Sequence, residues 1–76
     1  MPRKMTDYLA TGLAEGFEQP EGKTEADRRE EIIAAWQHLV DTGLAWRLQG
    51  WFGRQATALI KAGTIQAKTM EVEIGL

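Results

Sequence analysis

The 76-residue sequence predicts an all-α fold: a small three-helix domain whose last two helices form an antiparallel hairpin, followed by an extended C-terminal tail. Along two segments, apolar residues recur every three or four positions, as they do on the buried face of a helix. Gly43 and Gly63 follow those segments, and glycine favours the left-handed conformation in which many helices end. We expect a single domain, residues 1–76, with helices at about 6–16, 25–42 and 44–62 and an extended tail at 64–76.

The helix expected at 25–42 has clear signals at both ends. Thr24 offers a side-chain oxygen to the first turn, and the acidic residues after it favour the positive end of the helix dipole. Gly43 suits the position just after the last turn. The face that we expect in the core carries Ile32, Ile33, Trp36, Leu39 and Val40.

The helix expected at 44–62 contains two internal glycines, Gly50 and Gly53. Each costs a helix interior about 1 kcal/mol relative to alanine. The apolar spacing nevertheless favours one continuous helix, and a kink near Gly50 is the alternative. The apolar stripe consists of Ala45, Leu48, Phe52, Ala56, Leu59 and Ile60.

The two ends of the chain show different patterns. Leu9 and Leu13 lie one turn apart in the helix expected at 6–16, and Phe17 follows them. After Gly63 the pattern changes to alternation of apolar and polar residues, which is typical of an extended segment with one apolar face. Three arrangements stay open for this tail: it is loose, it lies against the helices, or it pairs with the same segment of a second copy.

Composition limits the classes of function. The net charge of −2 disfavours indiscriminate binding of nucleic acid, although residues 44–76 are basic, with four Lys or Arg against two Asp or Glu. Residues 1–43 carry five Lys or Arg against nine Asp or Glu. The start MPRKMTDY lacks the apolar segment of a signal peptide, and no apolar stretch approaches the length of a membrane span. We therefore expect a cytoplasmic protein that makes no membrane contact.

No group of residues typical of an enzyme is present. His38 has Asp41 and Thr42 at helical spacing but no nucleophile beside it, and a single histidine with zero cysteines cannot form a histidine-rich or thiolate metal site. The acidic cluster after Thr24 already has a structural role at a helix start. Neither a phosphate-binding glycine loop nor a helix-turn-helix fits the sequence. We expect no enzymatic activity, no cofactor and no metal.

The stretch WRLQGWFGRQ, residues 46–55, contains the candidate binding residues. On a continuous helix Arg47, Arg54 and Lys61 are seven positions apart and form one cationic stripe with Trp51 beside it. Such a stripe can bind phosphates and stack a base, or bind an acidic protein surface. The alternative is a solvated helix face with Trp51 as a partly buried flank.

Trp46 falls on the side of this helix away from the apolar stripe, so among the large aromatics it is the one that we expect to be exposed on a single chain. Either it contacts a partner protein or a second subunit, or the N-terminal helix covers it. A chain this short has a thin core, and tryptophan and arginine are enriched at interface hot spots, so we also expect a homo-oligomer, in the simplest case a dimer. The expected partner-binding residues are Trp46, Arg47, Gly50, Trp51 and Arg54.

Residues 34–63, AAWQHLVDTGLAWRLQGWFGRQATALIKAG, resemble a group of short uncharacterised proteins often encoded by tailed bacteriophages and bacterial mobile elements. The shared pattern runs W-Q-x-L-V-D-T-G-L-A-W-x-L-Q-G-x-F-G-R-x-A-x-x-L-I. The resemblance implies a small phage-type accessory protein, a class in which modulators and inhibitors of host machinery are common. We therefore expect an interaction protein that binds a host or phage protein, in the host cytoplasm if it is phage-encoded. The alternative is a nucleic-acid-binding regulator that uses Arg47, Arg54 and Lys61.

Overall fold

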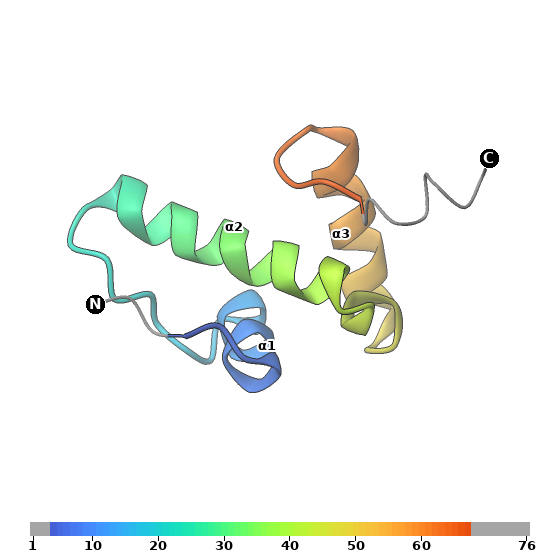
Figure 1. Cartoon of the computed structure of the whole chain (residues 1–76), viewed down its shortest axis with the longest axis horizontal. Helices are drawn as coiled ribbons and strands as arrows, with labels where there is room; N and C mark the ends of the chain where they lie inside the picture. The colour runs from blue at the N-terminus through green and yellow to red at the C-terminus, as the bar shows by residue number, and fades with distance from the viewer. Residues whose placement is uncertain (1–3, 68–76) are drawn as a thin grey trace.

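The structure is a computed structural model that describes residues 4–67, and in this range the chain forms α-helices and one 3₁₀ turn but no strand (Figure 1). The all-α class with three α-helices is therefore confirmed. Residues 68–76 of the expected tail lie outside the described residues. The elements are α1 (Asp7–Glu15), α2 (Glu25–Asp41), the 3₁₀ turn η1 (Leu44–Trp46) and α3 (Gly50–Lys61).

The first two helices begin and end within a residue of the expected positions because local hydrogen bonds define their ends. Thr6 and Thr24 each accept, through the side-chain oxygen, the N–H of the residue three positions later, both at 3.1 Å. After α1, Gly16 has a φ of +90°, and after α2, Gly43 has a φ of +81°. Glycine adopts this left-handed conformation without the steric cost of a Cβ atom.

The prediction of one continuous helix at 44–62 is wrong, because the chain leaves the helical conformation between Trp46 and Gly50. Only one 3₁₀ turn forms before the break, and Gln49, which precedes α3, has an extended ψ of 154°. The break places Gly50 at the first position of α3, where its N–H needs no partner within the helix. A glycine at that position avoids the cost that it has in a helix interior. The kink considered near Gly50 is in fact a complete interruption.

The break also redirects α3. This helix crosses the C-terminal end of α2 steeply, so the two helices meet at one end and do not pack along their lengths as the expected antiparallel hairpin (Figure 1). Their contact is aromatic: the ring centroids of Trp36 and Phe52 lie 5.9 Å apart. α1 packs against α2 on the other side.

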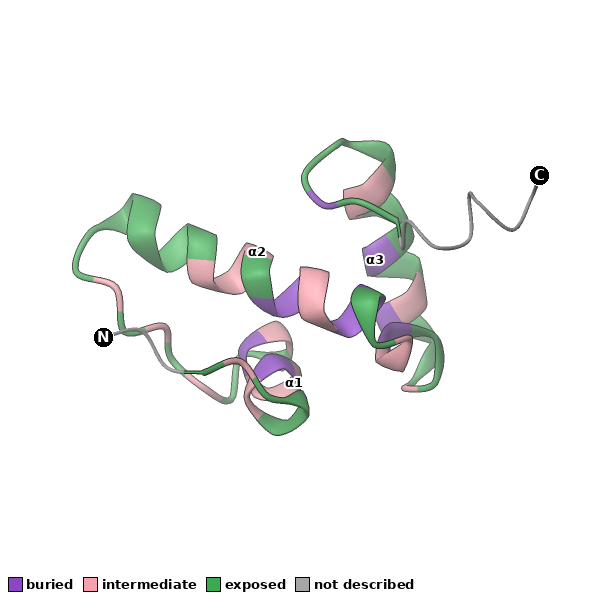
Figure 2. Ribbon diagram, viewed as in Figure 1, coloured by how far each residue is buried: buried purple, intermediate pink, exposed green. Residues whose placement is uncertain are grey.

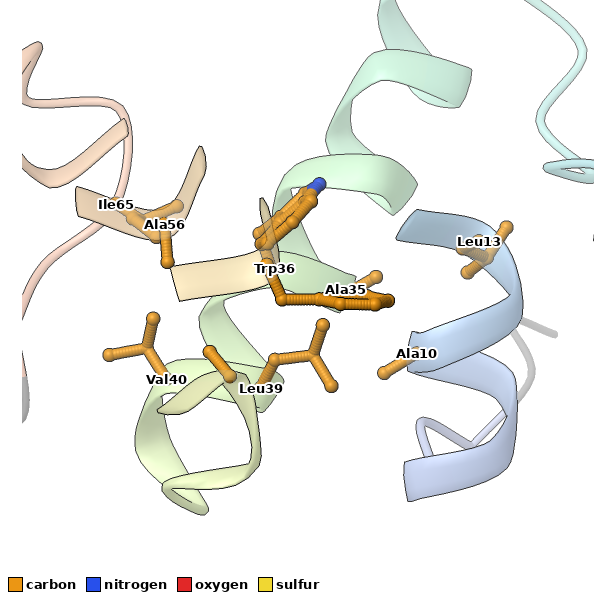
Figure 3. Packing of buried hydrophobic residues seen from close by; sticks show 10 residues of the cluster. Ala10, Leu13, Ala35, Trp36, Leu39, Val40, Ala56 and Ile65 are labelled. Carbon is orange, nitrogen blue, oxygen red and sulfur yellow. The ribbon is translucent and has the colours of Figure 1, made fainter. Parts of the chain in front are cut away.

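One hydrophobic core joins the three helices. Ala10 and Leu13 approach α2 from one side, and Ala56 and Ile65 approach it from the other (Figure 3). Trp36 is 5% exposed, which confirms its expected place in the core. Figure 2 shows that burial is concentrated where the helices meet, whereas the first turns of α2 are exposed. The buried residues are Ala10, Leu13, Ala35, Trp36, Leu39, Val40, Ala45, Phe52, Ala56 and Ile65.

The segment after α3 is held against α2 by the side-chain amide of Gln37. Its oxygen accepts the N–H of Gln66 at 2.9 Å, and its nitrogen donates to the carbonyl of the same residue at 2.8 Å. The neighbouring Ile65 is 3% exposed. The described start of the tail, 64–67, therefore lies against the helices, which is one of the three arrangements considered.

Replacement of Gly22 by alanine should lower the free energy of unfolding by about 1–3 kcal/mol, because it overpacks the contact between the loop and α2. A Cβ atom at this position would lie 2.6 Å from Cβ of Asp27 and 2.9 Å from the backbone nitrogen of Arg28. Urea unfolding measures the effect.

Gly50→Ala is the matched control for this measurement. Among the described residues, the neighbour that the new methyl group meets is Nη1 at the end of the Arg54 side chain, at 3.2 Å. Alanine also restricts the unfolded chain, so this variant should be stabilised by up to about 1 kcal/mol. Equal unfolding midpoints for the two variants would contradict the close packing at Gly22.

Candidate functional site

The five residues expected to bind a partner lie on η1, on the connection after it and on the first turns of α3. All five are exposed. Together they form the α3 face: Trp46, Arg47, Gly50, Trp51 and Arg54.

Trp46 is 50% exposed, and its indole lies over Gly53 of α3. A Cβ atom at Gly53 would lie 3.4 Å from Cε3 and 3.7 Å from Cζ3 of the indole, so a longer side chain would displace the ring. A methyl group would make an ordinary van der Waals contact there, so the indole rests directly on the helix surface at this position. One side of the ring is supported by protein while a large part of it contacts solvent.

Trp51 lies on the opposite flank of α3 from this contact. It is two positions before Gly53, which corresponds to about 200° around a helix. Its ring packs edge-on against Trp36, with centroids 6.0 Å apart and an interplanar angle of 74°, and it is 36% exposed. Trp51 is thus partly buried and partly exposed. Trp46 and Trp51 flank the outer side of α3, with Gly50 and Arg54 between them.

The cationic stripe expected on one continuous helix is not formed. Arg47 precedes α3, so only Arg54 and Lys61, two turns apart, share a side of this helix. All three side chains are exposed, and none of them makes an ion pair within residues 4–67. The cations are therefore free to contact a partner, but they do not form a single row.

His38 takes part in a contact between helices. Its Nε2 lies 2.8 Å from Oδ1 of Asp7, which joins α2 to the first turn of α1. The expected neighbour Asp41 instead accepts a hydrogen bond from Gln37 at 3.0 Å. Among residues 4–67 no three side chains of the metal-binding types come together. His38 therefore has a structural role, which is to join α2 to α1.

The family model of a domain of unknown function, DUF7417, matches residues 10–76. The chain belongs to the DUF7417 family. The match extends beyond residues 34–63 toward both ends and includes the whole α3 face. No curated protein and no solved structure matches this DUF7417 chain. No helix in the described part of the chain is both long and apolar enough to cross a membrane.

Two aromatic residues of the DUF7417 chain are more exposed than Trp46. Phe17 is 83% exposed and Tyr8 is 80% exposed, and the expected exposure of Trp46 is confirmed at 50%. Phe17 follows the left-handed Gly16, which turns the chain away from the apolar face of α1. A sign of this was present in the sequence, because a residue beyond a terminal glycine no longer follows the helical spacing.

The second feature that sequence patterns did not predict is a hollow of about 560 Å³ between α1 and α2. Its floor is apolar, and carboxylates surround it. The sequence indicated only that the acidic residues near Thr24 begin a helix. The carboxylates around the hollow come from α2 and from the loop before it. The apolar floor lies beneath them only because α1 packs against α2. The lining residues are Met5, Leu9, Leu13, Glu21, Gly22, Lys23, Asp27, Glu30, Glu31 and Ala34.

Iodide quenching of fluorescence should rank the three tryptophans in the order of their exposed fractions. Trp46 is 50% exposed, Trp51 36% and Trp36 5%, so quenching should be strongest for Trp46 and weakest for Trp36. Three variants are needed, each retaining one tryptophan with phenylalanine at the other two positions. In urea the three should be quenched alike. Stronger quenching of Trp51 than of Trp46 in the folded protein would contradict the described site.

Proposed function

We propose that this chain is a small phage-type accessory protein that binds another protein through the α3 face and thereby inhibits or modulates a host factor, for instance a defence factor, in the host cytoplasm. The observation that carries the proposal is the half-exposed Trp46 held over Gly53, with Arg47 and Arg54 exposed nearby. Tryptophan and arginine are the residue types most often found at the centre of protein interfaces. The phage-type origin rests on the resemblance of residues 34–63.

The support of the Trp46 ring favours binding. A side chain that is already held in one position loses less conformational entropy when a partner covers it. The indole offers a large apolar surface, and nearby guanidinium groups can bind carboxylates in a bidentate geometry. The proposed partner therefore presents an apolar pocket with carboxylates at its edge. The proposed function requires no catalytic step, no cofactor and no membrane.

A nucleic-acid-binding regulator is the second candidate. The observation that favours it is the exposure of Arg47, Arg54 and Lys61 without ion pairs in residues 4–67. Two properties favour the protein partner instead: the net charge is −2, and the three cations do not form one row.

Capture of partners from host lysate, with and without nuclease, tests the proposed function. One host protein should be recovered in both samples, and Trp46→Ala should reduce its recovery at least about tenfold, since hot-spot truncations cost 2 kcal/mol or more. Phe17→Ala is the matched control, because it removes an aromatic ring that is 83% exposed but lies off the α3 face. Equal loss in both variants, or recovery of nucleic acid alone, would overturn the protein-binding proposal.

The salt dependence of the recovered complex separates the two candidates. If the chain makes three phosphate contacts on duplex DNA, its affinity should fall about 40-fold when salt rises from 50 to 200 mM, because each contact releases condensed counterions. An interface anchored by an indole should change much less. Fluorescence anisotropy at several salt concentrations gives the slope, and a steep slope that Arg54→Ala reduces would favour nucleic acid.

A further inference from the structure

The hollow between α1 and α2 is large for so small a protein. Its volume of about 560 Å³ lies in the range of ligand-binding sites, which are typically a few hundred to about 1,000 Å³. Met5, Leu9, Leu13 and Ala34 form the apolar part of its lining. An apolar floor that faces water becomes more favourable when another apolar group covers it.

The rim of this hollow is acidic. Four carboxylates surround it, from Glu21, Asp27, Glu30 and Glu31, and among the described residues of the lining the only cation is Lys23. Glu31 accepts the N–H of Glu21 at 2.8 and 3.0 Å, which holds the loop before α2 against the helix. Asp27 and Glu30 are exposed. An occupant that places an apolar group on the floor and a positive charge beside Asp27 and Glu30 would therefore match the hollow.

The chain itself carries a surface of that kind. On the α3 face the indole of Trp46 is 50% exposed, and two exposed arginines accompany it: Arg47 is the next residue, and Arg54 follows Gly53, over which the indole lies. Neither arginine makes an ion pair within residues 4–67. The indole complements the apolar floor of the hollow, and the guanidinium groups complement its carboxylates.

The two surfaces lie toward opposite ends of α2. The hollow is formed by α1 and residues 27–34 of α2, whereas the α3 face belongs to η1 and α3, which meet α2 near its C-terminal end (Figure 1). One chain therefore cannot close its own hollow with its own α3 face, and contact requires a second copy.

We propose that the hollow between α1 and α2 binds the α3 face of a second copy of this chain, with Trp46 on the apolar floor and Arg47 and Arg54 on Asp27 and Glu30. The contact joins unlike surfaces. Two copies in contact therefore still have one unoccupied hollow and one unoccupied α3 face. These remaining surfaces bind each other or further copies. The proposal uses the α3 face of the proposed function but does not rest on a host partner, and the two compete for the same residues.

Analytical ultracentrifugation of the purified protein tests this contact. The wild-type chain should associate as its concentration rises and dissociate as salt rises, because the charge pairs are screened. Two variants each remove one half of the contact: Asp27→Lys with Glu30→Lys in the hollow, and Arg47→Glu with Arg54→Glu on the α3 face. Each should raise the dissociation constant at least about 100-fold, because like charges then face each other.

Mixing the two variants is the decisive measurement. The first retains an intact α3 face and the second an intact hollow, and their altered surfaces also carry opposite charges, so an equimolar mixture should associate with 1:1 stoichiometry although each variant alone is monomeric. Glu25→Lys with Arg29→Glu reverses two charges on exposed α2 residues outside both surfaces without changing the net charge, and this control should associate like the wild type.

A monomeric wild-type chain up to millimolar concentration would overturn the proposal, and so would a mixture that stays monomeric while both variants retain native circular dichroism. Because only purified protein is used, these outcomes do not depend on whether a host partner is found. Conversely, failure of the lysate experiment leaves the mixing result unaffected.

Discussion

The arrangement of this protein depends on one aromatic contact, that of Phe52 with Trp36. Phe52 is 2% exposed, and its ring centroid lies 5.9 Å from that of Trp36. Because α3 meets α2 only near one end, few other contacts orient it. Trp51 closes the same cluster from outside, with its ring centroid 4.2 Å from that of Phe52. Aromatic rings bury large areas in specific geometries, so this cluster determines both the position of α3 and its rotation about its own axis.

That rotation determines the candidate site. Once Phe52 points into the core, each later residue of α3 is turned by about 100° relative to the one before it. Gly53 then faces sideways and accommodates the indole of Trp46, and Arg54 faces outward. The exposure of the binding residues on α3 is thus a consequence of the packing of Phe52 in the core. The same packing separates the α3 face from the acidic hollow and makes contact between them possible only between two copies.

Part of the candidate site could be predicted from the sequence. The exposure of Trp46, Arg47 and Arg54 follows from their spacing relative to the apolar stripe, and this expectation agrees with the structure. The cationic stripe could not be predicted correctly, because it required a helix that continues through residues 47–49. The hollow was not predictable either, since its lining comes from separate segments, at residues 5–13, 21–23 and 27–34, that only the packing of α1 on α2 brings together.

The sequence by itself determined the helix limits that depend on neighbouring residues: the threonine caps before α1 and α2, and the glycines after all three α-helices. Each of these interactions joins residues a few positions apart, so its free energy depends on the local sequence alone. Only the tertiary structure decided the direction of α3, the contact of His38 with Asp7 and the attachment of Gln66 to Gln37. The residues of these two pairs are 31 and 29 positions apart, and each contact forms only when the helices have already packed on a common core.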